Sequence, residues 1–177
     1  FYVGPHAPFR DFELTLEVLT HSNSNSGVYF HTRYQDSGWP QGGFEAQVNN
    51  TYVKDPRKTG SLYAVKDVLE APAKDNEWWT YTIRVEGKKV TISVNGQVVN
   101  EYEEPEGTVD GKDFDRKLGE GTFALQGHDA GSTVSFRNIR VRKLSGSTTT
   151  TSAEPRDVKV GDAAPAFVLK DDAGRDW

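Results

Sequence analysis

The sequence of 177 residues contains no cysteine. Disulfides, thiolate nucleophiles and cysteine-ligated zinc sites are therefore excluded. No run of about 18 apolar residues occurs, so no segment has the pattern of a membrane-spanning helix. Neither sign of charge is in large excess, because the formal net charge is only −5 at pH 7. The charge gives no electrostatic reason to expect nucleic acid or an anionic membrane surface as a partner.

Helical periodicity is lacking as well, and alternation with a period of two residues takes its place. Apolar and polar residues alternate from Phe12 to Val18 and again from Trp79 to Val94, and Asn95-Gly96 predicts a tight turn of type I′. A further short strand is expected at residues 61–65. A change of parity between Phe136 and Ile139 predicts a β-bulge in the last strand. Short strands joined by turns indicate an all-β fold, an antiparallel two-sheet sandwich or jelly roll.

Two neighbouring predicted strands, at residues 25–33 and 43–49, share a polar face. The Gly/Pro-containing loop between them is short enough for a long hairpin. We expect His31 and Arg33 of the first strand to lie across from Glu45 of the second, where a cation keeps a partly buried carboxylate ionised. This face is too polar for a core and is the candidate site.

Glu45 and His128 are the candidate catalytic residues. The alternative for Glu45 is a solvated surface carboxylate. His128 follows Gln126 on one face of a predicted strand, and its alternative is a loop histidine that caps a turn. Tyr63, Lys66 and Asp129 are further candidates, for which ordinary surface is the alternative.

The strand of Glu45 lacks the second acid that ordinary glycoside hydrolysis requires. A glycosidase of the usual kind needs two carboxyl groups that flank the bond. Carboxamides, Gln47 and Asn49, stand two and four residues after Glu45, where sandwich-fold glucanases commonly carry the second acid. The pattern therefore argues against ordinary hydrolysis, with Asp129 left as a distant second carboxylate.

An ordered series of short motifs covers nearly all of residues 9–144. The motifs are Asp11-Phe12-Glu13-Leu14, Asn25-Ser26-Gly27-Val28-Tyr29-Phe30, Gly43-Phe44-Glu45-Ala46-Gln47, Thr59-Gly60-Ser61-Leu62-Tyr63, Asn76-Glu77-Trp78, Val94-Asn95-Gly96, Leu125-Gln126-Gly127-His128 and Phe136-Arg137-Asn138-Ile139-Arg140. This series resembles the 3-keto-disaccharide hydrolase domain family. The resemblance implies a concanavalin A-like jelly roll. Family members begin earlier, with strands around a Trp-rich start, so we expect the first strands of the sandwich to be missing from this chain.

The resemblance also implies a chemistry that needs only one base and one proton donor. The ketone of a 3-keto-glycoside acidifies the hydrogen on C2; a base removes it, the enolate expels the C1 substituent, and water adds to the enone. Glu45 and His128 serve as base and acid in an order that the sequence leaves open, and Arg33 and Lys66 are the candidate oxyanion stabilisers. The candidate substrate-binding residues are Asn25, His31, Arg33, Gln47, Tyr63, Lys66, Gln126 and Asp129.

The domain organisation follows from composition and from a second resemblance. Residues 1–144 are expected to form the sandwich domain, and the Ser/Thr-rich residues 145–157 a linker. Residues 158–177 contain Val160-Gly161-Asp162-Ala163-Ala164-Pro165-Ala166-Phe167-Val168-Leu169, which is similar to the opening strand of peroxiredoxin-like and other thioredoxin folds. The similarity implies a covalently linked thioredoxin-like domain that this chain only begins.

The expected ligand is a small carbohydrate, with neither nucleic acid nor a membrane as partner. No cofactor is expected, and bound Ca²⁺ in the loops is left open. The resemblance implies an extracytoplasmic bacterial protein, periplasmic or secreted. Two rival interpretations remain: a non-catalytic carbohydrate-binding module, since the same fold serves lectins, and a structural spacer for the domain that follows.

Overall fold

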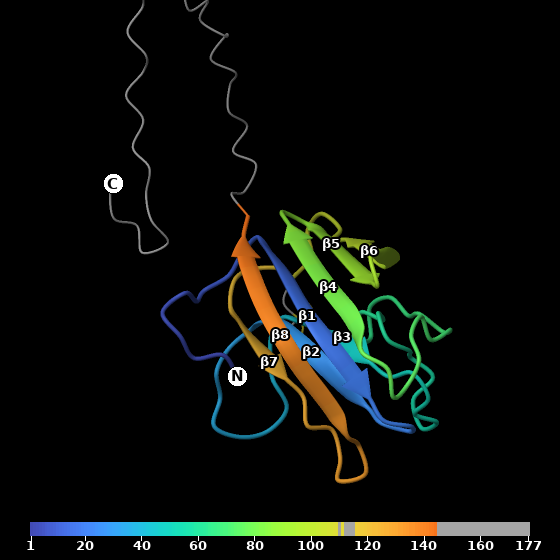
Figure 1. Ribbon diagram of the computed structural model, residues 1–177. Coiled ribbons are helices and arrows are strands. Elements are labelled where there is room, and N and C mark those ends of the chain that lie inside the picture. Colours follow the sequence, from blue (N-terminus) through green and yellow to red (C-terminus); the bar gives the residue numbers. More distant parts are fainter. Residues whose placement is uncertain (110, 112–115, 145–177) are drawn as a thin grey trace, which may run out of the picture. The chain divides into compact units, whose positions relative to one another are not determined.

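The computed structural model describes residues 1–109, 111 and 116–144, and within these ranges it contains eight β-strands and no helix (Figure 1). The strands form an antiparallel five-stranded sheet in the order β6-β5-β4-β1-β8 and a three-stranded sheet in the order β3-β2-β7. The predicted all-β two-sheet sandwich is therefore confirmed. The strands are β1 Phe12–Thr20, β2 Ser26–Thr32, β3 Phe44–Val48, β4 Trp79–Glu86, β5 Lys89–Val94, β6 Gln97–Glu103, β7 Thr122–Leu125 and β8 Val134–Lys143.

The core lies between the two sheets and is built by the alternation seen in the sequence. In β1, every second residue from Phe12 to Val18 is at most 2% exposed. β4 repeats the pattern from Trp79 to Val85, and β1 and β4 pair in register, with Leu14 opposite Ile83. Val28, Phe30 and Phe44 of the smaller sheet are buried against this face. Burial of these side chains, at about 25 cal/mol per Å² of apolar surface, stabilises the pairing of the sheets.

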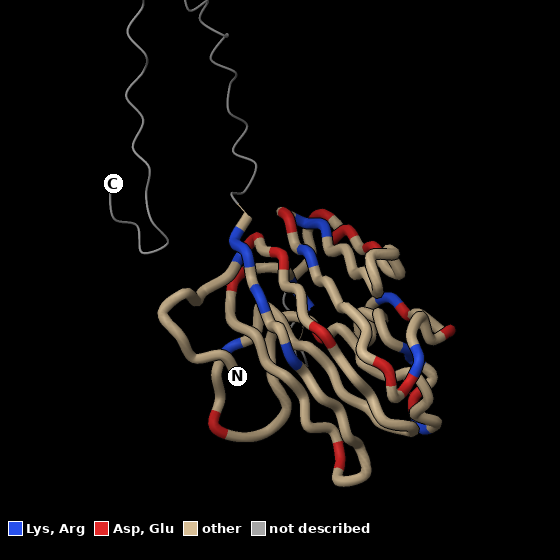
Figure 2. The backbone as a smooth tube through the Cα atoms, viewed as in Figure 1, with Lys and Arg blue, Asp and Glu red and all other residues tan. Residues whose placement is uncertain are grey.

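The outer face of the five-stranded sheet is charged and carries ion pairs across its strands. Glu13 of β1 accepts hydrogen bonds from Arg84 of β4 and Arg142 of β8, both at 3.0 Å. Figure 2 shows residues of both charge signs on this sheet. Exposed pairs of this kind contribute at most about 1 kcal/mol each. The pairs mark the face of the sheet that is exposed to solvent.

The structure confirms two local predictions, a turn and a β-bulge, and contradicts a third, a short strand. Asn95 and Gly96 both adopt positive φ, 50° and 79°, as the type I′ turn requires. The β1–β8 register shifts, with Asn138 at φ 52°, which confirms the predicted bulge. The strand predicted at residues 61–65 is wrong, because Leu62 and Lys66 bond to each other through their backbones and close a turn with Ala64 at φ 58°.

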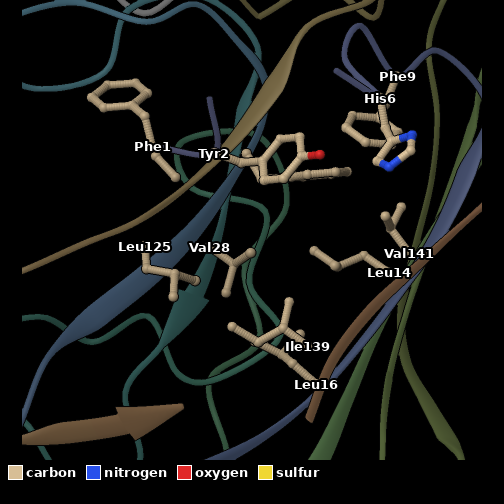
Figure 3. Close-up of a pocket in the computed structure, with 12 residues that line it drawn as sticks. Phe1, Tyr2, His6, Phe9, Leu14, Leu16, Val28, Leu125, Ile139 and Val141 are labelled. Carbon is tan, nitrogen blue, oxygen red and sulfur yellow. The ribbon is translucent and has the colours of Figure 1, made fainter. Parts of the chain in front are cut away.

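An apolar groove of about 550 Å³ is lined by strands of both sheets and by the N-terminal segment. Figure 3 shows Leu14, Leu16, Val28 and Ile139 around it, with Tyr2 above. β7 and β8, which contribute to its lining, are edge strands of their sheets. The lining is almost entirely aliphatic and aromatic, so it offers no group of acids and bases for catalysis.

Two expectations lie outside the described residues. The linker predicted at residues 145–157 and the thioredoxin-like segment predicted at residues 158–177 belong to the part of the chain that the structure leaves undescribed. Over the described ranges, no helix is long and apolar enough to cross a membrane.

Candidate functional site

A polar pocket of about 250 Å³ opens on the three-stranded sheet, on the side away from the core. Tyr29 of β2 and Glu45 and Gln47 of β3 come from the sheet itself. The remaining wall is formed by loop residues and by the residues that directly follow β7. The lining residues are Asn25, Tyr29, Trp39, Glu45, Gln47, Asp55, Tyr63, Gln126 and His128.

Glu45 lies in a triangle of side chains, two from β2 and β3 and one from the residue that follows β7. Tyr29 is directly opposite Glu45 in the β2–β3 pair, and its hydroxyl donates to Oε2 of Glu45 at 2.7 Å. Gln126, one residue after β7, donates through Nε2 to Oε1 of Glu45 and to the Tyr29 hydroxyl, both at 3.1 Å. The carboxylate is thereby held in one orientation with both oxygens engaged.

Burial dominates the electrostatics of Glu45. The residue is 5% exposed, and desolvation raises the pKa of its carboxyl group above the ordinary value. The Tyr29 and Gln126 hydrogen bonds and the charges of Arg116 and His128 act in the opposite direction and favour the ionised form. The net effect is a carboxyl group that retains a proton to higher pH than a surface glutamate does.

His128 is oriented by Asp129, which does not itself line the pocket. Nδ1 of His128 lies 2.7 Å from Oδ2 of Asp129, and that carboxylate also accepts from the Ser132 hydroxyl and from the backbone N–H of Gly131, both at 2.8 Å. These hydrogen bonds, that of His128 foremost, lower the pKa of Asp129 to about 2. An ionised partner at Nδ1 leaves Nε2 as the nitrogen available for proton transfer.

Two carboxamides in the pocket have acceptor atoms without a hydrogen-bond partner among the residues that the structure describes. Gln47 is 1% exposed and donates through Nε2 to Oδ1 of Asn25 at 2.9 Å, while its own Oε1 has no partner among the described residues. Oε1 of Gln126 also has no hydrogen-bond partner among the described residues. Buried acceptors without donors are uncommon in folded proteins, and hydroxyl groups or water can supply the missing donors.

The predicted pairing of His31 and Arg33 with Glu45 is wrong, since Tyr29 takes that place. The register between β2 and β7 shifts after Tyr29, and His31 adopts φ 56°, which marks a bulge that turns its side chain away. The His31 ring is buried, with Nε2 2.8 Å from the carbonyl oxygen of Arg10 and Nδ1 accepting from the N–H of Gly119 at 3.2 Å. Burial lowers the pKa of His31. His31 and the exposed Arg33 line a different hollow.

Lys66 also lies outside the pocket. It is exposed, and its ammonium group donates to the backbone carbonyl of Glu101 at 2.7 Å. Tyr63 does line the pocket, and the Arg57 guanidinium lies 4.8 Å from the centre of its ring. The structure thus brings together Asn25, Glu45, Gln47, Tyr63, Gln126 and His128, with Asp129 behind His128, and leaves out His31, Arg33 and Lys66.

Sequence reasoning missed four residues of the site or its surroundings. Tyr29 shares the predicted polar face with His31, so its alternation was a usable signal. Trp39 and Asp55 come from loops, and Arg116 from the loop between β6 and β7, where no periodicity reports which side chains point inward. Over the described ranges, no three His, Asp or Glu side chains are grouped as a metal ion would require.

Comparison with known structures shows similarity to two proteins of Parabacteroides distasonis, each named as a putative glycosyl hydrolase. One is 20% identical with a TM-score of 0.63, and the match covers 79% of this chain and 75% of that one. The other is 24% identical with a TM-score of 0.63, over 78% and 80% of the two chains. At these identities the similarity shows the fold.

A carbohydrate-binding module of Bacillus subtilis, CBM66, is similar at 17% identity with a TM-score of 0.54, over 78% of both chains. Comparison with curated proteins gives no match. The sequence model of one family, the 3-keto-alpha-glucoside-1,2-lyase-like domain, matches residues 4–142. This match spans all but the last residue of the eight strands and includes the polar pocket, and the chain therefore belongs to the family of 3-keto-alpha-glucoside-1,2-lyase-like domains.

Proposed function

We propose that the polar pocket binds the oxidised sugar of a 3-keto-glycoside and cleaves its C1–O bond by elimination followed by addition of water. One observation carries the proposal: Glu45 and His128 line the same pocket in contrasting environments. Glu45 is buried, and desolvation raises the pKa of its carboxyl group, whereas His128 is hydrogen-bonded to Asp129, whose pKa is lowered. Two titratable groups in environments of this kind are suited to act as acid and base.

In this mechanism, His128 is the base and Glu45 the acid. Nε2 of His128 takes the proton from C2, and the C–H electron pair forms an enolate with C3. The enolate re-forms the C3 ketone, its electrons form a C1–C2 double bond, and the C1–O bond breaks. Glu45 protonates the departing oxygen. Water then adds to C1 as Glu45 takes back a proton, and C2 receives a proton from Nε2 of His128 after that nitrogen has exchanged its proton with solvent.

The rest of the pocket supports a polyhydroxylated ligand. The carboxamides of Asn25, Gln47 and Gln126 line the pocket, and amides of this kind can donate to and accept from sugar hydroxyls. The Tyr63 hydroxyl is a donor in the lining, and the positive charge of Arg116 acts on Glu45. We assign enolate stabilisation to Tyr63 and Arg116 in place of Arg33 and Lys66, because charge that develops in a water-poor site is best stabilised by fixed donors.

Ordinary hydrolysis by two carboxyl groups is the competing mechanism, because the pocket lining contains a second carboxylate, Asp55, besides Glu45. Its Oδ1 accepts from the backbone N–H of Arg57 at 2.9 Å and from the Arg57 guanidinium at 3.2 Å. These contacts engage Oδ1 of Asp55 with a donor backbone group and a cation, which suits neither a general acid nor a nucleophile that must be free to attack.

The test compares 3-keto-trehalose with trehalose as substrates. The wild type is expected to cleave 3-keto-trehalose but not trehalose, because trehalose lacks an acidified hydrogen at C2. In D₂O, deuterium is expected at C2 of the product. Glu45→Gln and His128→Asn are each expected to lower kcat/KM about 100-fold or more. Glu86→Gln, an exposed carboxylate on the five-stranded sheet, is the matched control.

Other outcomes identify the rivals. Cleavage of trehalose at a similar rate, lost in Asp55→Asn, would establish the two-carboxylate mechanism. Binding of glycans without release of sugar from either substrate would establish a carbohydrate-binding module.

A further inference from the structure

A second hollow of about 380 Å³ adjoins the polar pocket. Three residues, Trp39, Gln126 and His128, line both hollows. Beyond them, the second hollow has a less polar wall, formed in part by Pro40 and Leu125. A ligand that fills the polar pocket and extends past His128 therefore enters the second hollow.

Trp39 stands between the two hollows and is 48% exposed. Its ring centre lies 5.9 Å from that of His128, with the planes tilted by 45°. An indole with about half its surface accessible beside a reactive group is suited to pack against the C–H face of a sugar ring. Aromatic side chains of this kind supply rigid apolar contact area with few rotatable bonds.

The side chain of Gln35 makes three hydrogen bonds within the loop that carries Trp39. Its Nε2 donates to the carbonyl oxygens of Ser37 and Trp39, both at 2.7 Å, and its Oε1 accepts from the N–H of Gln41 at 3.0 Å. These three bonds connect both ends of the loop. The indole is thereby presented at a defined place, as a binding platform requires.

We propose that the second hollow is the subsite for the leaving-group sugar and that Trp39 is its platform. The inference rests on the proposed function, since it assumes that the oxidised unit occupies the pocket of Glu45. The bond that breaks then lies beside His128, which both hollows share. The substrate class is accordingly a disaccharide or longer glycoside, and the second unit contributes affinity through its apolar face.

The first experiment measures binding with trehalose and methyl α-glucoside as probes, by titration calorimetry on the 177-residue chain. The wild type is expected to bind trehalose about tenfold more tightly than methyl α-glucoside, the equivalent of about 1.4 kcal/mol. Trp39→Ala is expected to reduce this ratio to about one, and Trp39→Phe to keep most of it. Trp78→Ala is the matched control, because Trp78 is also exposed but stacks on Arg137 and lines neither hollow.

A second variant blocks the hollow without removing the indole. Gly127 lines only the second hollow, and a Cβ atom there would meet no atom within 4 Å. Gly127→Leu is therefore expected to fold normally and to lower the trehalose preference about tenfold by occupying space. Thermal unfolding checks the fold of each variant.

The outcomes separate the subsite from the chemistry. A trehalose preference that is lost in Trp39→Ala and Gly127→Leu supports the subsite, even when 3-keto-trehalose is not cleaved, in which case only the proposed reaction fails. Equal affinities for the two probes in the wild type, a preference unchanged by both variants, or no binding of trehalose at millimolar concentration would overturn the subsite, even when 3-keto-trehalose is cleaved.

Discussion

Tyr29 and Glu45 face each other directly across β2 and β3, and the phenol donates its proton to the carboxylate at 2.7 Å. The position that the sequence assigns to a cation is thus occupied by a neutral donor. A phenol favours the ionised carboxylate less than an adjacent guanidinium does, so burial prevails and the pKa of Glu45 is raised. The raised pKa favours the acid role that the proposed mechanism gives to Glu45.

Tyr29→Phe is predicted to raise the pKa of Glu45 further, because it removes a hydrogen bond that favours the ionised form. The limb of the pH–rate profile that falls as Glu45 loses its proton is expected to move to higher pH. The free energy of unfolding is expected to fall by about 1 kcal/mol with the lost bond. Rate profiles and urea denaturation measure both effects. Tyr63→Phe, which removes a hydroxyl from the same pocket, is expected to leave that limb in place.

Gly27→Ala is predicted to displace the Glu45 side chain. A Cβ atom at Gly27 would overlap Oε1 of Glu45 and lie 2.8 Å from its Cγ. We expect kcat/KM to fall about 100-fold through misplacement of the carboxyl group, with about 1–3 kcal/mol lost in stability. Gly119→Ala adds a methyl group where no atom lies within 4 Å and is the control. Equal activities of the two variants would contradict the close contact.

Asp129→Asn is predicted to lower kcat/KM about 100-fold while the fold is retained, because the amide no longer supplies an ionised partner for Nδ1 of His128. Asp129 acts through His128 and is a positioning residue, so the separate values of kcat and KM are the decisive measurement. We expect kcat to fall while KM for 3-keto-trehalose changes little. A structural role alone would lower the stability of the domain without this separation.

His31→Gln is predicted to destabilise the domain by about 1–3 kcal/mol at pH 7.5, since the buried ring bonds to Arg10 and Gly119. Its folded pKa is lowered from 6.5 by burial, so the unfolded chain binds the proton more readily. Wild-type stability is therefore full above pH 6.5 and falls as the pH drops through the lowered pKa. His31→Gln is expected to remove this dependence, and His21→Gln, at an exposed position, to keep it.

The strands of the five-stranded sheet could be predicted because one face of that sheet is solvated and the other buried. β1 and β4 alternate between buried and half-buried residues along their length, so the polarity of the sequence reports the pleat. The bulge at Asn138 was visible for the same reason, as a change of parity on a two-faced strand.

The site itself was predicted only in part, because β2 is buried along its whole length. Val28, Tyr29 and Phe30 suit either face, so the sequence carries no sign of the shift that turns His31 away from Glu45. Trp39 comes from a loop whose conformation depends on the hydrogen bonds of Gln35, and polarity patterns do not encode such bonds.

Gln126 contacts Glu45 across 81 positions of the sequence, and its backbone N–H donates to the carbonyl oxygen of Gly27 at 2.9 Å. The β2–β3 hairpin alone therefore cannot complete the surroundings of Glu45. One of the two donors to its carboxyl group is supplied only when the segment after β7 has paired with β2, so a chain cut before Gln126 would lack it.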